Sequence, residues 1–191
     1  MENMMPKSVA TSVSAVRWQD GALIVGGSLV VALSAQIAIP LPWTPVPVTL
    51  QPLAVMLVGA FAGPWRGAAS MFLYLMEGAA GLPVFTPIGA PGIARLIGPT
   101  GGYLLSYPLA AYVIGQFAAR GWTATFGKAF AAFLLTSYLI LFSGGAWMVL
   151  AGARTWYEAA VLGIVPFIAW DLLKVLFAAS MTSLKSRRSR A

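Results

Sequence analysis

Long apolar runs that follow one another with hardly a charge inside them constrain this chain more than any other feature. The runs cover residues 21–40, 49–63, 66–80, 101–119, 126–151 and 165–184, within a few positions. A helix of about 20 apolar residues spans the hydrocarbon core of a bilayer. Only 9% of the residues are charged, against about 25% in soluble domains, which is too few to cover a water-facing surface. The sequence therefore predicts one all-α integral membrane domain over residues 1–191, with six transmembrane helices.

Two connections between these runs are rich in proline and glycine yet remain apolar, at residues 39–49 and 81–100. Proline and glycine at this density prevent a regular helix. Backbone amides in apolar surroundings need partners inside the protein, so we expect both connections to fold back onto the helices, on the same side of the membrane. Residues 154–163 are expected to form a short interfacial helix, with Trp156 and Tyr157 at the level of the lipid headgroups.

The positions of lysine and arginine predict the orientation of the chain in the membrane. The net charge is +7, and the charges stand at the ends of the apolar runs, which favours membrane orientation over nucleic-acid binding. With the N-terminus inside, nine of the twelve basic residues fall on the cytoplasmic side, and they are Lys7, Arg17, Arg66, Arg120, Lys128, Lys185, Arg187, Arg188 and Arg190. Only Arg95 and Arg154 then lie outside. We expect a multi-pass protein whose N-terminal segment 1–20 and basic tail 185–191 are both cytoplasmic.

The residue types that are absent exclude several classes of function. The sequence contains no cysteine and no histidine, which excludes disulfides, thiolate metal sites, cysteine nucleophiles and histidine bases. It also contains no Walker A motif, so an ATP-driven step requires a partner. We therefore expect no catalytic residues, no metal site, no cofactor and no nucleic-acid partner.

Asp171 and Lys174 form the strongest candidate site. Pro166 suits the first turn of a helix, so both charges lie within the last apolar run, and their spacing places them on one helix face. Each charge alone in hydrocarbon costs about 3 kcal/mol. One interpretation is an ion pair that only holds the helix in the bundle. We favour a polar ligand in a wet cavity, because a buried pair is rarely the most stable choice.

Other side chains near the predicted outer ends of the helices are weaker candidates. Arg95 either grips a ligand carboxylate in two places or anchors the chain at the interface. Glu77 is a possible ligand contact, although an interfacial position is favoured. Gln36 and Gln51 flank the proline-rich connection and are placed to face a cavity, whereas Trp43 either covers a ligand or acts as an interfacial anchor.

Small residues in the first run, including Ser28 and Ala32, lie four positions apart. Such spacing lets helices approach closely. Packing within the bundle is the default interpretation, and a docking face for a partner helix is the alternative.

Three separated stretches carry a resemblance to a known family. IPLPWTPVPVTLQPLAVMLVGAFAGPWRGAASMFLYLMEGAAGLPVF, GPTGGYLLSYPLAA and PFIAWDLLKVLFAA follow in order over residues 25–182. Together they resemble the BioY family, the substrate-binding (S) components of energy-coupling factor (ECF) biotin transporters. The resemblance implies a six-helix S-component bundle in the bacterial plasma membrane, with a biotin site near the outer surface and no ATPase activity. It also implies a T component and two cytosolic ATPases as partners.

The resemblance also bears on individual residues. The family's Asp-x-x-Lys motif falls on Asp171 and Lys174, and its basic position before GPTGGYL falls on Arg95. Ser28 and Ala32 then belong to the helix that faces the T component. Many members have an aliphatic residue where this chain has Glu77. The alternative function is a stand-alone vitamin transporter, possibly coupled to protons, with Asp171 or Glu77 as the proton site.

Overall fold

The computed structural model describes residues 18–151 and 154–188, and it is mostly helical. The long helices are α1 (Trp18–Gln36), α2 (Gln51–Ala62), α3 (Pro64–Ala79), α5 (Gly101–Ala119), α6 (Phe126–Leu150) and α8 (Val165–Arg188). Shorter elements join them, namely strands β1 (Ala38–Ile39) and β2 (Val48–Thr49), helices α4 (Ile93–Ile97) and α7 (Trp156–Ala159), the 3-10 turn η1 (Trp122–Ala124) and the π-helical segment η2 (Ala160–Ile164). Within the described residues, three stretches are long and apolar enough to cross a membrane, at Trp18–Gln36, Phe126–Leu150 and Trp156–Lys185.

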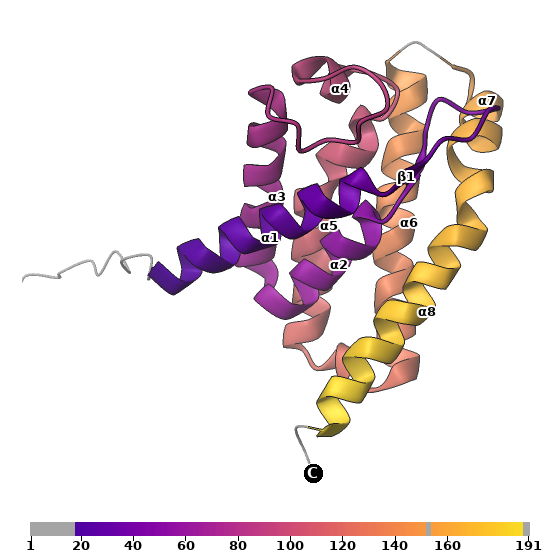
Figure 1. Cartoon of the computed structure of the whole chain (residues 1–191). Coiled ribbons are helices and arrows are strands. Elements are labelled where there is room, and N and C mark those ends of the chain that lie inside the picture. Colours follow the sequence, from indigo (N-terminus) through magenta and orange to yellow (C-terminus); the bar gives the residue numbers. More distant parts are fainter. Residues whose placement is uncertain (1–17, 152–153, 189–191) are drawn as a thin grey trace, which may run out of the picture.

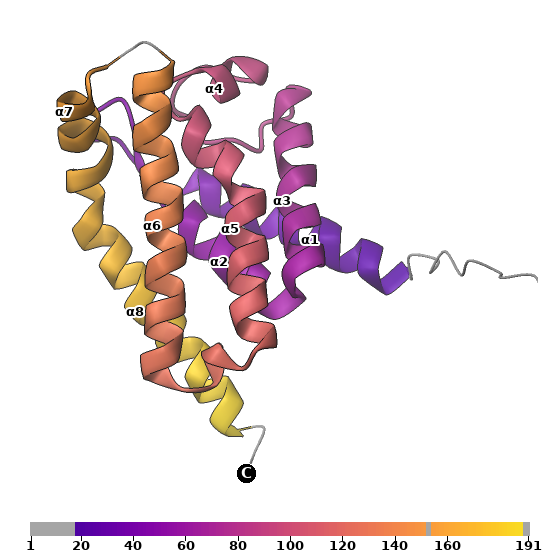
Figure 2. The ribbon, with the colours of Figure 1, turned by 180° about the vertical axis from the view of Figure 1, so that it is seen from behind.

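Helix α5 lies at the centre of the bundle and contacts α2, α3 and α6. Helices α3, α5 and α6 run roughly alongside one another, whereas α1 and α8 cross the bundle obliquely (Figure 1). Seen from behind, α6, α5 and α3 cover that face (Figure 2). This arrangement leaves α8 packed against α6, so the charged pair expected on α8 faces into the bundle.

The sharp reversal between α2 and α3 shows how the local sequence sets the helix ends. Gly63 has φ +87°, a conformation that L side chains rarely adopt, and its N–H donates to the carbonyl of Gly59. Pro64 follows as the first residue of α3, where a missing N–H costs nothing. Only Gly63 separates the two short helices, so the chain turns sharply from α2 into α3.

The outer surface of the bundle is largely apolar. Large exposed side chains follow the long helices, among them Leu33 on α1, Phe142 on α6 and Leu173 on α8. Apolar patches of this extent are not stable against water but match the hydrocarbon of a bilayer. The surface pattern therefore agrees with the three apolar spans in defining a membrane protein.

Both irregular connections fold back onto the helices, as the sequence predicted. The connection around residues 39–49 forms a minimal antiparallel pair, with Ala38 opposite Thr49 and Ile39 opposite Val48. In the connection 81–100, the Gln36 amide on α1 donates to the carbonyl of Phe85 at 3.2 Å, and the Trp147 indole on α6 donates to the carbonyl of Gly98 at 3.0 Å. These bonds satisfy backbone groups that would otherwise meet apolar surroundings.

Residues 154–163, expected as one interfacial helix, are divided between α7 and η2. Thr155 caps α7 by accepting from the N–H of Glu158, whose carboxylate accepts in return from the N–H of Thr155. Trp156 and Tyr157 are both exposed, as an interfacial position requires.

Apart from Lys174, the basic residues within the described part of the chain gather at two opposite ends of the molecule. Arg66 lies in the first turn of α3, Arg120 follows α5, Lys128 lies in the first turn of α6, and Lys185, Arg187 and Arg188 lie near the end of α8. These helix ends lie toward the lower end of the molecule in Figure 1. At the upper end lie α4, which carries Arg95, and the connection before α7. Lys7, Arg17 and Arg190, which the orientation argument also counts, lie outside the described residues.

Candidate ligand-binding pocket

A pocket opens among α5, α6 and α8 and is closed by the two folded-back connections. The first connection and the start of α2 contribute Val46, Pro47, Thr49, Gln51 and Pro52, and the second contributes Phe85, Thr86, Arg95 and Thr100. The long helices contribute Tyr103, Leu104, Tyr107, Ile140, Leu141, Phe167, Asp171 and Lys174. The cavity volume is about 60 Å³.

Asp171 and Lys174 form a buried ion pair at one end of the pocket. The Lys174 Nζ donates to Asp171 Oδ1 at 2.9 Å, and the residues are only 7% and 8% exposed. Ser137 on α6 donates its hydroxyl to the other carboxylate oxygen, Oδ2, at 3.1 Å. The carboxylate is thereby held in one orientation from two helices, at the edge of the pocket that it lines.

Gln51, the first residue of α2, has a fixed amide orientation. Its Oε1 accepts from the Thr49 hydroxyl at 3.3 Å, and its Nε2 donates to the hydroxyl of Tyr74 on α3 at 2.6 Å. The Thr49 hydroxyl also accepts from the backbone N–H of Gln51 at 3.3 Å. This small network ties the end of the first connection, at Thr49, to α2 and α3.

Arg95 on α4 reaches into the pocket from the second connection. Its Nη2 donates to the carbonyl of Thr86 at 2.8 Å, whereas its buried Nε has no hydrogen-bond partner within the described part of the chain. Burial lowers the pKa of the Arg95 guanidinium, and the neighbouring Tyr74 opposes this change. A guanidinium still stays protonated at neutral pH, so this side chain offers a fixed positive charge and at least one available donor.

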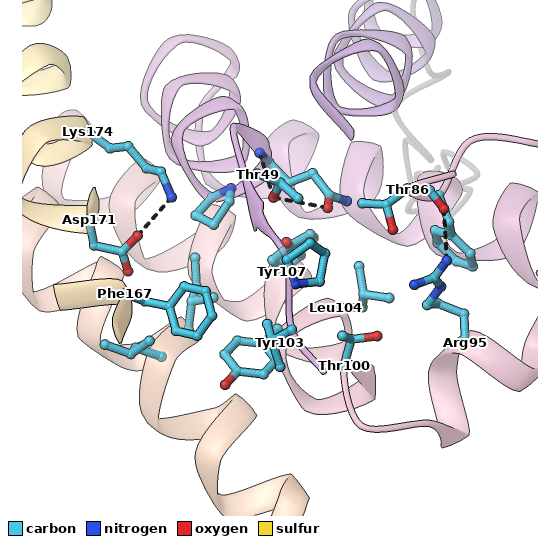
Figure 3. A pocket seen from close by; sticks show the side chains of 17 residues that line it. Thr49, Thr86, Arg95, Thr100, Tyr103, Leu104, Tyr107, Phe167, Asp171 and Lys174 are labelled. Atoms are coloured by element: carbon cyan, nitrogen blue, oxygen red, sulfur yellow. Dashed lines mark hydrogen bonds and ion pairs between the residues drawn. The ribbon is translucent and has the colours of Figure 1, made fainter. Parts of the chain in front are cut away.

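The charged groups stand at opposite ends of the pocket (Figure 3). Asp171 and Lys174 occupy one end, Arg95 and Thr86 the other, and Phe167, Tyr103 and Leu104 line one side between them. Such a site suits an elongated molecule with polar groups at both ends and an apolar body. Among residues 18–151 and 154–188, no group of three or more metal-ligating side chains gathers at one place.

Several residues of this site were not expected from the sequence, namely Thr49, Tyr103, Tyr107, Ser137 and Phe167. The helical spacing was a usable signal for three of them. Tyr103 and Tyr107 are four positions apart, as are Phe167 and Asp171, and residues four apart share a helix face. Ser137 had no such signal, because its partner lies on another helix.

Two residues predicted for the binding site lie elsewhere. Trp43 is 61% exposed and does not line the pocket, so it does not cover a ligand in this conformation. Glu77 also lies outside the lining and accepts a hydrogen bond from the hydroxyl of Ser28 on α1. Gln36 faces a second cavity of about 190 Å³, which adjoins the pocket and shares Phe85 and Thr86 with it.

The predicted docking residues on the first helix are buried in this structure. Ser28 is 0% exposed and Ala32 is buried as well, because this side of α1 packs against α3. This burial favours packing within the bundle, and a docking role for these two residues stays a prediction.

Long apolar helices around a buried, polar-ended pocket define a helical membrane protein that holds a small ligand. Comparison with known proteins identifies its family. The model of the BioY family matches residues 5–190, and the chain belongs to this family. It is accordingly a transport protein rather than an enzyme.

Relatives and a solved structure agree with this assignment. A Pyrococcus horikoshii protein named probable biotin transporter BioY is 38% identical over 145 residues, or 75% of this chain and 81% of the relative. The biotin transporter BioY of Thermotoga maritima is 35% identical over 152 residues, or 78% and 85% of the two chains. A crystal structure of the S component for biotin from an ECF-type ABC transporter superposes with a TM-score of 0.78 at 23% identity, over 89% and 92% of the chains, which shows a shared fold.

Proposed function

We propose that this chain is the biotin-binding S component of an ECF transporter, which captures biotin at the outer face of the membrane and delivers it to the cytoplasm. The observation that carries this proposal is a pocket with a buried carboxylate–ammonium pair at one end and a buried guanidinium donor at the other. The names of the relatives support the choice of biotin over other vitamins.

Biotin matches the pocket in chemistry as well as in shape. The ureido ring has two N–H donors and one carbonyl acceptor, which suit the Asp171 carboxylate and the Lys174 ammonium. The valerate carboxylate at the other end of the molecule suits the available donor of Arg95, since guanidinium groups bind carboxylates with charge-assisted hydrogen bonds. The apolar thiophane ring and chain then lie along Phe167, Tyr103 and Leu104. Buried polar groups left unpaired by other ligands would provide the specificity.

In the membrane, we infer that all the long helices cross and that the end carrying α4 and α7 faces outward. The basic residues at the opposite end favour a cytoplasmic position for that end. Both termini are then cytoplasmic, in the plasma membrane. Helices α2 and α3 are short, and the folded-back connections complete the thickness that these helices do not span.

Transport needs a source of energy that this chain does not carry. The sequence has no Walker A motif, so ATP hydrolysis falls to two cytosolic ATPases, coupled through a membrane T component. Uptake of biotin by liposomes containing this chain alone and a proton gradient would instead support the stand-alone transporter.

Titration of the purified chain tests the binding function directly. We expect tight binding of biotin without ATP, and no comparable binding of thiamine or riboflavin, because this subunit alone builds the pocket. Arg95→Gln should weaken biotin binding, whereas Arg154→Gln, which removes a solvent-exposed guanidinium, should not. Equal affinity for the three vitamins, or no affinity for biotin, would refute the proposal.

A further inference from the structure

Tyr103 on α5 occupies a slot between two glycines of neighbouring elements. Gly144 on α6 lies against the ring so closely that a Cβ at this position would overlap the ring carbons. On the other side, a Cβ at Gly163 in η2 would lie only 2.8 Å from the Tyr103 hydroxyl. Contacts this short do not occur between real side chains, so the ring fits only because both residues lack a Cβ. We call the space between Gly144 and Gly163 the tyrosine slot.

The hydroxyl of Tyr103 is fixed as firmly as its ring. It donates to the carbonyl of Gly163 at 2.5 Å, and Gly163 belongs to the π-helical segment that leads into α8. A buried hydroxyl that left this carbonyl would lose its hydrogen bond and leave an unsatisfied acceptor. Tyr103 therefore cannot swing into or out of the pocket without a cost, and it forms a rigid wall.

The opposite wall has a different character. Phe85 and Thr86 belong to the irregular connection 81–100 and separate the pocket from the second cavity. The Phe85 ring is itself packed against Gly78 and Tyr74, whereas Thr86 is only half-buried, so this side has room to yield at Thr86. A ligand that presses on the lining therefore displaces Thr86 more readily than Tyr103, and the Tyr103 wall limits how deep the ligand reaches.

We propose that Tyr103, held in the tyrosine slot, is a specificity-determining residue that limits the bulk of the ring system bound beside Asp171. Tyr103 and Phe167 are neighbours next to the Asp171 end of the pocket (Figure 3). The inference rests on the proposed function, in which the ureido end of biotin meets Asp171. The fused thiophane ring then lies against Tyr103, which acts through its shape because its hydroxyl is already paired with Gly163.

Filling the slot tests the proposal. In Gly144→Ala the added methyl drives the Tyr103 ring toward the pocket, and biotin affinity should fall by about tenfold or more. Desthiobiotin lacks the sulfur and hence the closed thiophane ring, so its affinity should fall less. The ratio of desthiobiotin affinity to biotin affinity should therefore rise by about tenfold. Gly127→Ala, on the same helix and with no atom within 4 Å of the new methyl, should leave both affinities unchanged.

Emptying the slot is the complementary test and does not depend on the folding of Gly144→Ala. Tyr103→Leu removes the wall. The affinity for biotin sulfone, which carries two additional oxygens on the ring sulfur, should then rise about tenfold relative to the affinity for biotin. Adding Gly144→Ala to Tyr103→Leu should then change little, since the ring that the methyl displaces is gone.

The outcomes separate this inference from the proposed function. Wild-type chain that fails to bind biotin overturns both. Wild-type chain that binds biotin, together with a Tyr103→Leu variant that keeps the wild-type ratio of sulfone to biotin, overturns the role of Tyr103 alone. A shift of that ratio, with unchanged affinities in Gly127→Ala, supports it.

Discussion

Replacing Asp171 by Asn separates a structural ion pair from a ligand-binding one. The substitution keeps the size of the side chain but leaves the Lys174 ammonium, 8% exposed, without the carboxylate that lies 2.9 Å away. Removing one partner of a buried pair costs about 3 to 5 kcal/mol of unfolding free energy. Asp171→Asn alone should therefore lower the stability of the protein whichever role the pair has.

The double variant Asp171→Asn, Lys174→Met distinguishes the two roles. It removes both charges, so stability should return to within about 1 kcal/mol of the wild type. If the carboxylate accepts a ureido N–H, binding should still be weaker by about 1.5 to 3 kcal/mol, the value of a hydrogen bond to a charged group. That difference corresponds to roughly a ten- to hundredfold weaker affinity.

A thermal melt with and without biotin measures both effects at once. At a biotin concentration of 100 times the wild-type Kd, mass action stabilises the wild type by about 2.7 kcal/mol. A variant with a hundredfold higher Kd gains only about 0.4 kcal/mol at the same concentration. Glu158→Gln, which neutralises an exposed acid and preserves the α7 cap, should show the full wild-type shift. A double variant that also showed the full shift would falsify the ligand role of Asp171.

Three further predictions concern topology, packing and ligand release. A cysteine in place of Ala90 should react with an impermeant reagent from outside the cell and one in place of Gly127 only after permeabilisation, and the reverse pattern would invert the proposed orientation. Ser28→Leu should lower the unfolding free energy by about 1 to 3 kcal/mol in denaturant melts, because the larger side chain overpacks against α3, whereas Val30→Leu on the exposed face of α1 should be neutral. Equal stabilities of the two variants would place Ser28 on the surface. Phe85→Ala should speed biotin dissociation by about tenfold or more in a stopped-flow chase, because Phe85 separates the pocket from the second cavity. An unchanged dissociation rate would show that the ligand leaves by another route.

The long helices were predictable because they follow from the length and apolarity of the runs. Helix α5 covers the expected residues 101–119, and α6 ends one position before the expected residue 151. The largest errors occur at ends where other effects compete. Helix α1 stops at Gln36 rather than at residue 40, because the next residues enter the strand pair, and α8 continues to Arg188 because lysine and arginine are good helix formers.

The facing of individual side chains was less predictable, because a helix that is apolar all round gives no amphipathic signal. Tyr74 and Glu77 are three positions apart on α3. Tyr74 nevertheless accepts a hydrogen bond from Gln51, which lines the pocket, whereas Glu77 accepts one from Ser28 on α1. Charge was the more reliable signal, since Arg95, Asp171 and Lys174 all line the pocket. A charge in apolar surroundings must find a polar partner, whereas an aromatic residue such as Trp43 has no such requirement.

Helix α8 connects the ligand site mechanically to the far end of the molecule. It runs without interruption from Val165 to Arg188, so Asp171 and Lys185 belong to one stiff rod and lie about 21 Å apart along its axis. At the far end, the Lys185 ammonium sits 4.4 Å from the centre of the Phe61 ring on α2. A tilt of the rod by only a few degrees about the ligand site would displace Lys185 by an ångström or more and pull it away from that ring. If ligand binding tilts α8, a fluorophore beside Phe61 would therefore report the occupancy of the pocket at the opposite end of the bundle.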